Sequence, residues 1–301
     1  MSYKVGISTF ELQKIYGEKG AIGVAKKVGA DSIDFFTNAY YVSNPDSIYS
    51  KSDEEIVAYF TELKNYAEEL GVFISQTHGR LRIFMNEPEL DRLCLENARR
   101  DLLAASALGA PVCVMHGINT AVMGVNASPQ IMRDLCYEKF SNILKWAKEY
   151  NVKLATESFG YHTIAAANEF FGNDKEFKNI FERISAEGDN ADYFTVCVDT
   201  GHTNSAVRFG NCSVGDFIRM FPGKVSCLHL HDNDGINDQH RPVYCGVINW
   251  DDVFDALEEV RFNGVYNLEI NCSCFGKGFE LETAEFAIRN LKFALKNRLK
   301  Q

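Results

Sequence analysis

Short apolar segments recur along the whole chain, and stretches with one charged face separate them. Eight of these segments are rich in β-branched residues and almost continuously hydrophobic, as strands buried on both faces are. In chain order they are Val5–Phe10, Ser32–Phe36, Val72–His78, Val112–Gly117, Lys153–Ser158, Phe194–His202, Val225–Asp232 and Tyr266–Asn271. Strands that alternate with amphipathic helices predict βαβ units and a parallel sheet. Eight such units without a linker predict one α/β domain over residues 1–301, a closed (β/α)8 TIM barrel.

Local signals mark where the helices of this barrel begin and end. The segment 52–55, Ser-Asp-Glu-Glu, supplies a cap and an acidic first turn for one helix. Glycine follows the last apolar residue of three helical stretches, a position typical of helix ends, at Gly29, Gly71 and Gly109. A doubly wound open sheet is the main alternative fold, but it usually has a glycine-rich phosphate turn after its first strand. This chain reads Thr-Phe-Glu-Leu at residues 9–12, which favours the barrel.

Composition narrows the class of protein further. Hydrophobic residues make up 46% of the 301 residues and charged residues 24%, which is enough apolar mass for a large core. The net charge of −10 offers no general footprint for a polyanion, although an acidic protein can carry a local basic groove. The nine cysteines form no C-x-x-C pair, and we interpret them as reduced thiols. Without a signal-peptide pattern or an apolar run of about 18 residues, we expect a cytoplasmic protein with no membrane span.

Histidines and carboxylates gather at the ends of the predicted strands. All seven histidines lie between His78 and His240, and six of them stand at or just past the end of an apolar segment. Imidazoles and carboxylates at such positions are what a divalent-metal site at a barrel mouth requires. His162 stands off any predicted strand, and we expect it to be structural or peripheral. Two long connections, 37–50 and 117–128, follow strand ends on this side, either as substrate loops or as ordinary surface loops.

Three carboxylates are the most informative members of this set. Glu157 ends the fifth predicted strand, Asp199 lies in the sixth, and Glu269 ends the apolar part of the eighth. An ionised carboxylate in an apolar strand is costly unless a cation or hydrogen bonds compensate it. A salt bridge is the structural alternative, but no lysine or arginine adjoins either glutamate in the sequence. We therefore expect these carboxylates to face a metal cation.

Nearby histidines support the same interpretation. His202 lies three residues after Asp199, so the two side chains could face one centre or two adjacent ones. His229 and His231 are two residues apart in one predicted strand, so they share a face. If this face is the inner one, the pair supplies one metal ligand and one substrate contact; if it is the outer one, both histidines are structural.

The remaining candidates are weaker when each is taken alone. His78 and His116 each close a strand and precede a glycine, which allows a sharp turn or the close approach of a ligand. Asp238 and His240 lie in the loop after the seventh strand, where an Asp-x-His sequence is more often solvated than metal-binding. The cations near the mouth, each able to hold an acidic substrate group or to be solvated, are Arg80, Arg82 and Arg241.

Taken together, these residues resemble the pattern of the xylose-isomerase-like TIM-barrel superfamily. Its members include sugar isomerases, ketose 3-epimerases, inosose-handling enzymes and the type IV AP endonucleases. The resemblance extends over almost all 301 residues, and it is specific for the superfamily but not for the substrate. It is carried by Glu157, Asp199-x-x-His202, His229-x-x-Asp232, Asp238-x-His240 and Glu269.

The sugar isomerase and epimerase members imply a mononuclear site in this chain. By that resemblance Glu157, Asp199, His229 and Glu269 hold one divalent ion, and His202 contacts the substrate. Oxygen-rich coordination with one imidazole favours Mn²⁺, also suits Co²⁺ or Mg²⁺, and tolerates Zn²⁺. Glu157 and Glu269 then remove and return a carbon-bound proton through a metal-stabilised enediolate. Further substrate contacts are expected from His78, His116, His231, Asp238, His240 and Arg241.

The same resemblance leaves other activities open. In type IV AP endonucleases nine ligands bind three zinc ions, and each of these ligands has a counterpart in this chain. However, the sequences at 156–159 and 229–234 depart from the repair enzymes' pattern, and the loops lack the basic clusters that phosphate-backbone binding needs. We therefore expect a sugar isomerase or epimerase with a small carbohydrate substrate and no nucleic-acid partner. A trinuclear zinc phosphodiesterase and a sugar or inosose dehydratase are the alternatives, and a homo-oligomer is possible.

Overall fold

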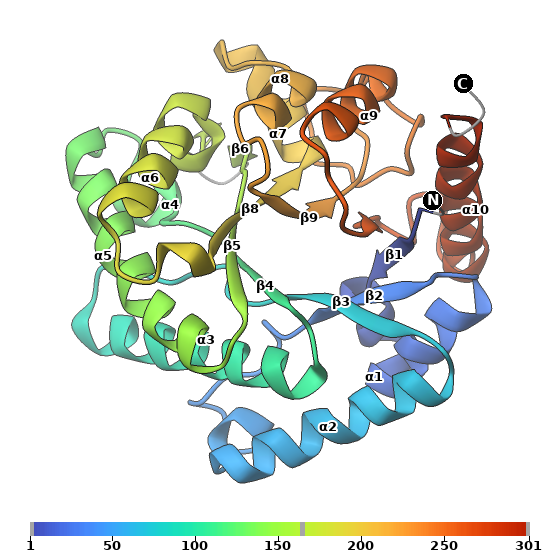
Figure 1. Ribbon diagram of the computed structural model, residues 1–301, viewed down its shortest axis with the longest axis horizontal. Coiled ribbons are helices and arrows are strands. Elements are labelled where there is room, and N and C mark those ends of the chain that lie inside the picture. Colours follow the sequence, from blue (N-terminus) through green and yellow to red (C-terminus); the bar gives the residue numbers. More distant parts are fainter. Residues whose placement is uncertain (1–2, 163–165, 299–301) are drawn as a thin grey trace.

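Eight parallel strands form the centre of the protein in a computed structural model that describes residues 3–162 and 166–298 (Figure 1). They are β1 (Val5–Ser8), β2 (Ser32–Phe36), β3 (Phe73–His78), β4 (Val112–Met115), β5 (Lys153–Glu157), β8 (Phe194–Asp199), β9 (Val225–His229) and β10 (Tyr266–Leu268). From β1 to β9 each strand pairs with the next of these in the chain, and β1 also pairs with β10. A parallel bridge between Leu230 and Leu268 joins the last two strands. The predicted α/β TIM barrel is therefore confirmed.

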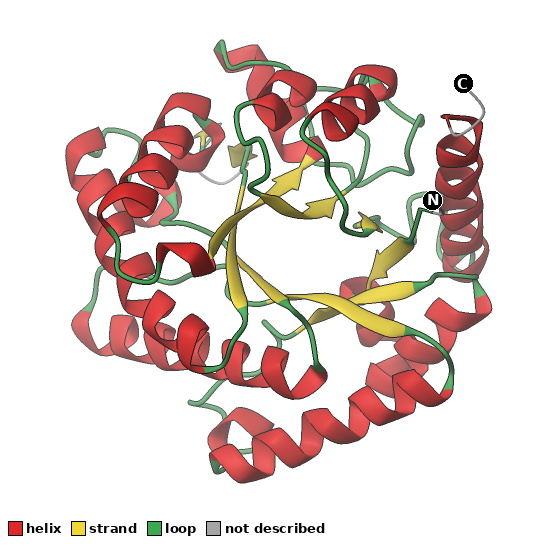
Figure 2. Ribbon diagram, in the orientation of Figure 1, coloured by secondary structure: helices red, strands yellow, loops and turns green. Residues whose placement is uncertain are grey.

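Helices surround the strands on the outside of this barrel (Figure 2). The α-helices are α1 (Phe10–Lys27), α2 (Asp53–Glu69), α3 (Pro88–Leu108), α4 (Thr120–Met123), α5 (Pro129–Glu149), α6 (Asp174–Glu187), α7 (Thr200–Ala206), α8 (Val214–Arg219), α9 (Trp250–Glu259) and α10 (Glu280–Arg298). Short 3-10 helices are η1 (Ile48–Ser50), η2 (Phe170–Gly172), η3 (Ala191–Tyr193) and η4 (Val207–Phe209). An antiparallel pair of two-residue strands consists of β6 (Tyr161–His162) and β7 (Ala167–Asn168). His162 thus lies in a strand, and its side chain is outside the described part of the chain. None of the described helices is both long and apolar enough to cross a membrane.

The predicted helix ends are confirmed by the backbone. The Ser52 side chain accepts a hydrogen bond from the Glu55 amide, and the Glu55 side chain accepts one from the Ser52 amide, which makes a capping box for α2. Gly29, Gly71 and Gly109 follow α1, α2 and α3 with positive φ angles of 82°, 71° and 73°. This left-handed conformation ends a helix at little steric cost when the residue is glycine. These turns lead the chain back into β2, β3 and β4.

Several predicted strands end earlier than the hydrophobic pattern indicates. The sixth segment was expected to continue to His202, but β8 ends at Asp199 and α7 begins at the next residue. The reason is local: the Asp199 side chain caps α7 by accepting a hydrogen bond from the His202 amide at 2.6 Å. The first segment likewise ends at Ser8, because Phe10 begins α1. The seventh ends at His229, three residues before its predicted end at Asp232.

Two connections hold the loops at the carboxyl end of the barrel together. The long loop 117–128 contains α4, whose first residue, Thr120, donates a backbone hydrogen bond to the Glu169 carboxylate. In return, the Phe170 amide donates to the Thr120 hydroxyl at 2.8 Å. The long loop 37–50 ends in η1, where the Tyr49 hydroxyl donates to Asp101 of α3 at 2.8 Å. Both loops are therefore tied to neighbouring segments.

A small apolar cluster fills the interior directly below the candidate site. Its members are Val112, Val114, Ala155, Cys197 and Cys227. Ala155, Cys197 and Cys227 each stand two residues before a predicted ligand, and side chains two apart in a strand share a face. The ligands therefore form the next layer of the same interior, at the carboxyl ends of the strands.

Candidate metal centre

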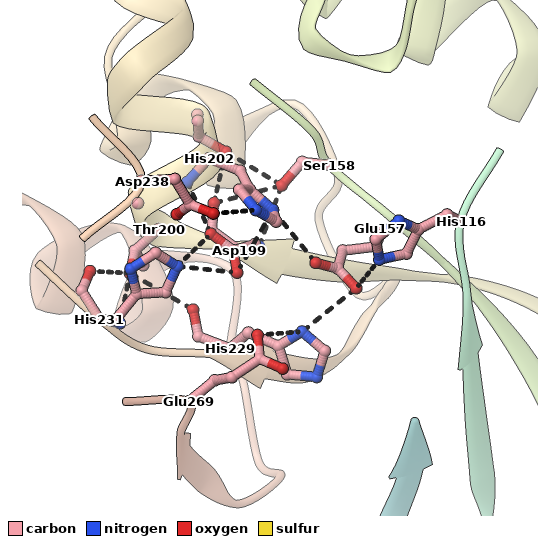
Figure 3. Close-up of polar contacts among 12 residues, drawn as sticks. His116, Glu157, Ser158, Asp199, Thr200, His202, His229, His231, Asp238 and Glu269 are labelled. Carbon is pink, nitrogen blue, oxygen red and sulfur yellow. Dashed lines mark hydrogen bonds and ion pairs between the residues drawn. The ribbon is translucent and has the colours of Figure 1, made fainter. Parts of the chain in front are cut away.

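The parallel arrangement of the strands brings their carboxyl ends to one mouth, and most of the predicted site residues lie there. His78, Glu157, Asp199 and His229 are the last residues of β3, β5, β8 and β9, while His116 and Glu269 directly follow β4 and β10. All six are buried. Three sets of ligand atoms can be distinguished in this region, which we call the inner, bridging and outer groups. Figure 3 labels most of their side chains.

The inner group consists of His78, Glu157, His229 and Glu269. One ligand atom from each residue lies within 4.8 Å of the others. Nδ1 of His229 is 3.2 Å from a Glu157 oxygen and 3.4 Å from a Glu269 oxygen. Nε2 of His78 is 3.4 Å from the same Glu157 oxygen, and its ring stacks on His229 with centroids 4.9 Å apart. Two imidazoles and two carboxylates thus converge on one point.

The bridging group consists of Glu157, Asp199 and His202. Nδ1 of His202 lies 3.2 Å from Oε1 of Glu157 and 3.5 Å from Oδ2 of Asp199. Glu157 belongs to both the inner and the bridging group, because its two oxygens face different partners. The geometry therefore places Asp199 beside the inner group, through the shared carboxylate of Glu157.

The outer group consists of His202, His231, Asp238 and His240. Nε2 of His202 is 3.5 Å and Nε2 of His240 is 3.1 Å from the Asp238 carboxylate. The rings of His231 and His240 stack with centroids 3.8 Å apart. The loop after β9 thus carries Asp238 and His240 back over the mouth, and His202 connects this group to the bridging group.

Unsatisfied ligand atoms indicate that the region fits a cation. Both Glu157 oxygens and the ring nitrogens Nε2 of His116, Nδ1 of His202 and Nδ1 of His229 are buried and make no hydrogen bond within the described residues. Burying such groups without a hydrogen bond is costly, and metal coordination removes that cost. Carboxylate oxygens combined with imidazole nitrogens suit Mn²⁺, Co²⁺, Fe²⁺ or Zn²⁺. The three groups are therefore fitted to hold a divalent metal.

The close packing of carboxylates and imidazoles in the site shifts their pKa values in opposite directions. Burial by itself would raise the pKa of Glu157, but the nearby imidazoles of His116 and His229 outweigh it and lower this pKa well below its usual range. Asp199 behaves in the same way, because burial raises its pKa while His202 and His231 lower it further. The opposite holds for His202 and His229. Burial by itself would lower their pKa, but the surrounding carboxylates outweigh it and raise this pKa well above the ordinary value. Glu157 and Asp199 are thus held in their ionised form, which a metal ligand needs.

The structure brings most of the predicted metal set together. Glu157, His229 and Glu269 share the inner group, while Asp199 joins Glu157 in the bridging group. His78, which we expected to contact substrate, is the fourth member of the inner group. His116 lies 3.1 Å from Glu157 and belongs to none of the three groups. The assignment of metal and substrate roles to these residues stays a prediction.

The inner face was one of two alternatives for His229 and His231, and both point into the site. Nδ1 of His229 faces the inner group, whereas Nε2 of His231 lies 2.9 Å from an oxygen of Asp199. Asp238 and His240, weak candidates by sequence, are part of the outer group. The guanidinium of Arg241 donates to the Cys245 carbonyl at 3.4 Å, and within the described contacts no ion pair joins it to the three groups.

Two charged groups near the mouth were not resolved from the sequence. Arg80 is neither solvated nor available as a simple anion site, because it is buried and pairs with Asp101 of α3 at 2.5 Å. Asp34 of β2 is fully buried behind His229, with Oδ2 3.0 Å from Nε2 of that ring. A carboxylate inside the apolar run 32–36 is the same signal that identified Glu157, and it could have indicated Asp34 as well.

Comparison with known proteins places this barrel in a family. The sequence profile described as xylose isomerase-like TIM barrel matches residues 22–293. The chain belongs to this family. The uncharacterized protein y4fM of Sinorhizobium fredii is similar to this family member, with 26% identity over 166 residues. That match covers 55% of the chain and 49% of y4fM, so the chain spans about half the length of this relative.

Solved structures of other proteins share the barrel of this family member. A D-tagatose 3-epimerase-like protein superposes with a TM-score of 0.71 at 18% identity, over 99% of this chain and 100% of that one. An L-ribulose 3-epimerase gives a TM-score of 0.71 at 14% identity, over 99% and 96% of the two chains. The IOLI protein, whose structure has a bound zinc atom, gives 0.69 at 16% identity, over 98% and 97%. At these identities the likeness shows the fold alone.

Proposed function

We propose that this protein is a divalent-metal-dependent sugar isomerase or epimerase in which Glu157 and Glu269 move a carbon-bound proton. The observation that carries the proposal is the inner group, where oxygens of both glutamates lie within 3.4 Å of Nδ1 of His229. Two carboxylates that flank one metal position can approach a bound substrate carbon from different sides. This arrangement provides the acid and the base that isomerisation and epimerisation need.

The residues of the inner and bridging groups would hold the metal. Mn²⁺ is the preferred ion by ligand type, and Zn²⁺, Co²⁺ or Mg²⁺ are also compatible. When bound, a divalent ion supplies Lewis acidity to a carbonyl and the neighbouring hydroxyl, which acidifies the proton between or beside them. Glu157, the last residue of β5, would accept that proton through its carboxylate, which belongs to both the inner and the bridging group. Glu269, whose carboxylate faces the same Nδ1 of His229 at 3.4 Å, would return a proton to the same carbon or to its neighbour.

Polar groups around the mouth would position the hydroxyls of the sugar. His202 and His240 flank the Asp238 carboxylate at 3.5 and 3.1 Å, and these three side chains would contact the sugar hydroxyls. Phe159 stacks on His202, with ring centroids 4.5 Å apart, and so offers an apolar surface beside these donors. A small carbohydrate fits this mixture of donors and apolar surface, and the net charge of −10 argues against a nucleic-acid partner. The two epimerase-type neighbours support this choice of substrate class.

A trinuclear zinc phosphodiesterase is the second candidate, and one specific observation favours it. The inner, bridging and outer groups adjoin each other and share Glu157 and His202, as a cluster of several metals would require. Against it stands the scarcity of cations at the mouth, where Arg80 is already paired with Asp101. Backbone phosphates are held mainly by lysine and arginine, so this scarcity favours the sugar substrate.

The test is proton exchange from a sugar carbon. The Mn²⁺-loaded protein is incubated with a panel of ketoses and ketose phosphates in D2O, and the carbon-bound hydrogens are followed by NMR. The proposal expects deuterium to enter at one carbon next to the carbonyl, together with an isomer or epimer of the sugar. Elemental analysis of protein purified without chelator gives the metal count in parallel. Zinc-dependent cleavage of an abasic DNA duplex, with no exchange into any sugar, would overturn the proposal in favour of the second candidate.

A further inference from the structure

A fully buried carboxylate stands behind the inner group and is not one of its members. Asp34 of β2 has no exposed surface, and its Oδ2 lies 3.0 Å from Nε2 of His229. The other nitrogen of the same ring, Nδ1, faces Glu157 and Glu269 at 3.2 and 3.4 Å. His229 therefore spans the space between Asp34 and the position of the metal.

The chemistry of this contact determines which nitrogen of His229 is free. A carboxylate can only accept a hydrogen bond, so Nε2 carries the hydrogen and donates it to Asp34. In the neutral ring Nδ1 then keeps its lone pair, and this lone pair is directed at the inner group. We propose that Asp34 is a positioning residue that fixes the tautomer and ring orientation of His229, and thereby strengthens metal binding at Nδ1. The inference rests on the metal site of the proposed function.

The backbone around Asp34 is arranged to hold this carboxylate in place. The pairing between β2 and β3 shifts register after Ile33, so that Asp34 lies opposite Gln76. Such a bulge re-aims the side chains beyond it. The side-chain Nε2 of Gln76 donates to Oδ2 of Asp34 at 3.3 Å and to the Leu228 carbonyl, next to His229, at 3.4 Å. Asp34 is thus held by side chains of two strands, the neighbouring β3 and β9, which does not pair with β2.

A purely structural role accounts less well for these contacts. Oδ1 of Asp34 is buried and makes no hydrogen bond within the described residues, which an ordinary structural carboxylate would avoid. No lysine or arginine pairs with Asp34 among the described ion pairs; its only ionisable partner there is His229. A cation bound to Nδ1 would share its charge with the ring and so compensate the buried carboxylate. Carboxylates that orient a metal-bound histidine in this way typically contribute about 10- to 100-fold to metal affinity.

The test measures metal binding without substrate. Dissociation constants for Mn²⁺ and Co²⁺ are determined by competition with a fluorescent chelator for the wild type, Asp34→Asn and Asp34→Ala, and the visible absorption spectrum of bound Co²⁺ is recorded. We expect the affinity to fall about 10- to 100-fold, more for Ala than for Asn, because Asn still accepts the hydrogen bond but lacks the charge. The Co²⁺ spectrum should change in the Ala variant.

Two further variants separate this role from general destabilisation. Ser32→Ala alters a buried residue on the same strand and face, away from His229, and should leave the metal affinity unchanged. Gln76→Met removes the donor to Asp34 without touching His229, and should weaken binding by a smaller factor; it also serves if Asp34→Ala does not fold. An Asp34→Asn or Gln76→Met protein that binds both metals within twofold of the wild type, with an unchanged Co²⁺ spectrum, would overturn the inference. Metal binding that depends on Asp34 in a protein without sugar chemistry would instead refute the proposed function and leave this inference standing.

Discussion

Glu157 makes more contacts inside the site than any other carboxylate described in it. Its Oε1 lies 3.2 Å from His202, while its Oε2 lies 3.1 Å from His116 and 3.2 Å from His229. Both oxygens are buried without hydrogen bonds in the described part of the chain. One carboxylate therefore connects the inner group to the bridging group, and a change here affects both.

The two glutamates should be separable by substitution. Glu157→Gln should lower turnover by about 100-fold or more and also reduce metal content, because Glu157 serves two groups. Glu269→Gln should lower turnover by a similar factor while some metal is retained, since Glu269 belongs to the inner group alone. Steady-state rates measured together with elemental analysis check both. A Glu269→Gln protein with full metal content and wild-type turnover would exclude Glu269 from proton transfer.

His116 distinguishes the two candidate functions. Its Nε2 lies 3.1 Å from Glu157, but it is not a member of the three groups. In a sugar isomerase, His116→Ala should change KM or kcat and leave about one metal ion per chain, because the inner group is intact. Elemental analysis and sugar kinetics of the variant provide the check. If the wild type cleaves abasic DNA with zinc and the variant loses both this cleavage and bound zinc, the phosphodiesterase is correct.

Single residues could be identified from the sequence where their chemistry conflicts with their surroundings. Glu157 and Glu269 stand out because an ionised side chain is expensive in an apolar strand. Asp34 carries the same signal and was overlooked. The ion pair between Arg80 and Asp101 could not be predicted, because its partners are 21 residues apart and meet only when α3 packs on the barrel. Pairing of that kind is a property of the tertiary structure.

The loop after β9, residues 230–249, is held by one buried carboxylate at its base. Oδ2 of Asp232 accepts a hydrogen bond from the Trp250 indole at 2.7 Å, and Oδ1 accepts from the Ile248 amide at 3.2 Å. The backbone of Asp232 also pairs with Arg241 in both directions, at 2.8 and 2.9 Å. The base of the loop that carries Asp238 and His240 is therefore closed by Asp232.

Opening this loop should affect the outer group selectively. Trp250→Phe removes the indole donor and leaves Oδ2 of Asp232 without that buried hydrogen bond, a loss of about 1 to 3 kcal/mol. We expect a weaker apparent affinity for substrate, or for an outer metal, with the affinity of the inner metal unchanged. Hydrogen exchange of residues 233–249 and metal titration measure the two effects. Equal loss of affinity at the inner group would contradict this separation.

At the level of elements, periodicity and end signals predicted the barrel, but local capping decided where the elements stop. All eight predicted strands are present, because a strand buried on both faces leaves a continuous apolar run. The end of β8 was misplaced because hydrophobicity does not show that Asp199 caps the next helix. The pair β6 and β7 was missed because strands of two residues are too short for any periodic signal.

For the whole molecule, protons and a metal ion should compete for the same histidines, and the pH dependence of folding stability should show this competition. Burial by itself would lower the pKa of His240, but Asp238 raises it to about 9. In the same way, surrounding carboxylates outweigh burial and raise the pKa of His202 and of His229. A histidine whose pKa is higher in the folded than in the unfolded state stabilises the fold. This contribution is fully present below the unfolded pKa of about 6.5 and is lost as the pH rises through the folded pKa. The metal-free protein should therefore lose stability between about pH 6.5 and pH 9.

The stabilisation that the metal adds should show the opposite trend with pH. Metal binding needs neutral imidazoles, so affinity, and with it the increase in Tm caused by the metal, grows as the pH rises. Thermal unfolding with Mn²⁺ and with EDTA at pH 6, 7 and 8 measures the difference between the two curves. A gap that narrows with rising pH would contradict both the pKa shifts and the assignment of histidines as ligands.

The unequal exposure of the inner and outer groups has a kinetic consequence. Glu157 and His229 have no exposed side-chain surface, whereas the side chains of Asp238 and His240 are 40% and 25% exposed. An ion held by the inner group is enclosed by buried side chains, whereas one held by the outer group could escape through movement of a single loop. Exchange of the one expected ion with free labelled metal should then be slow if the inner group holds it and fast if the outer group holds it. The residence time of each ion, rather than its affinity, would decide which metal the protein carries from the cell in which it folded.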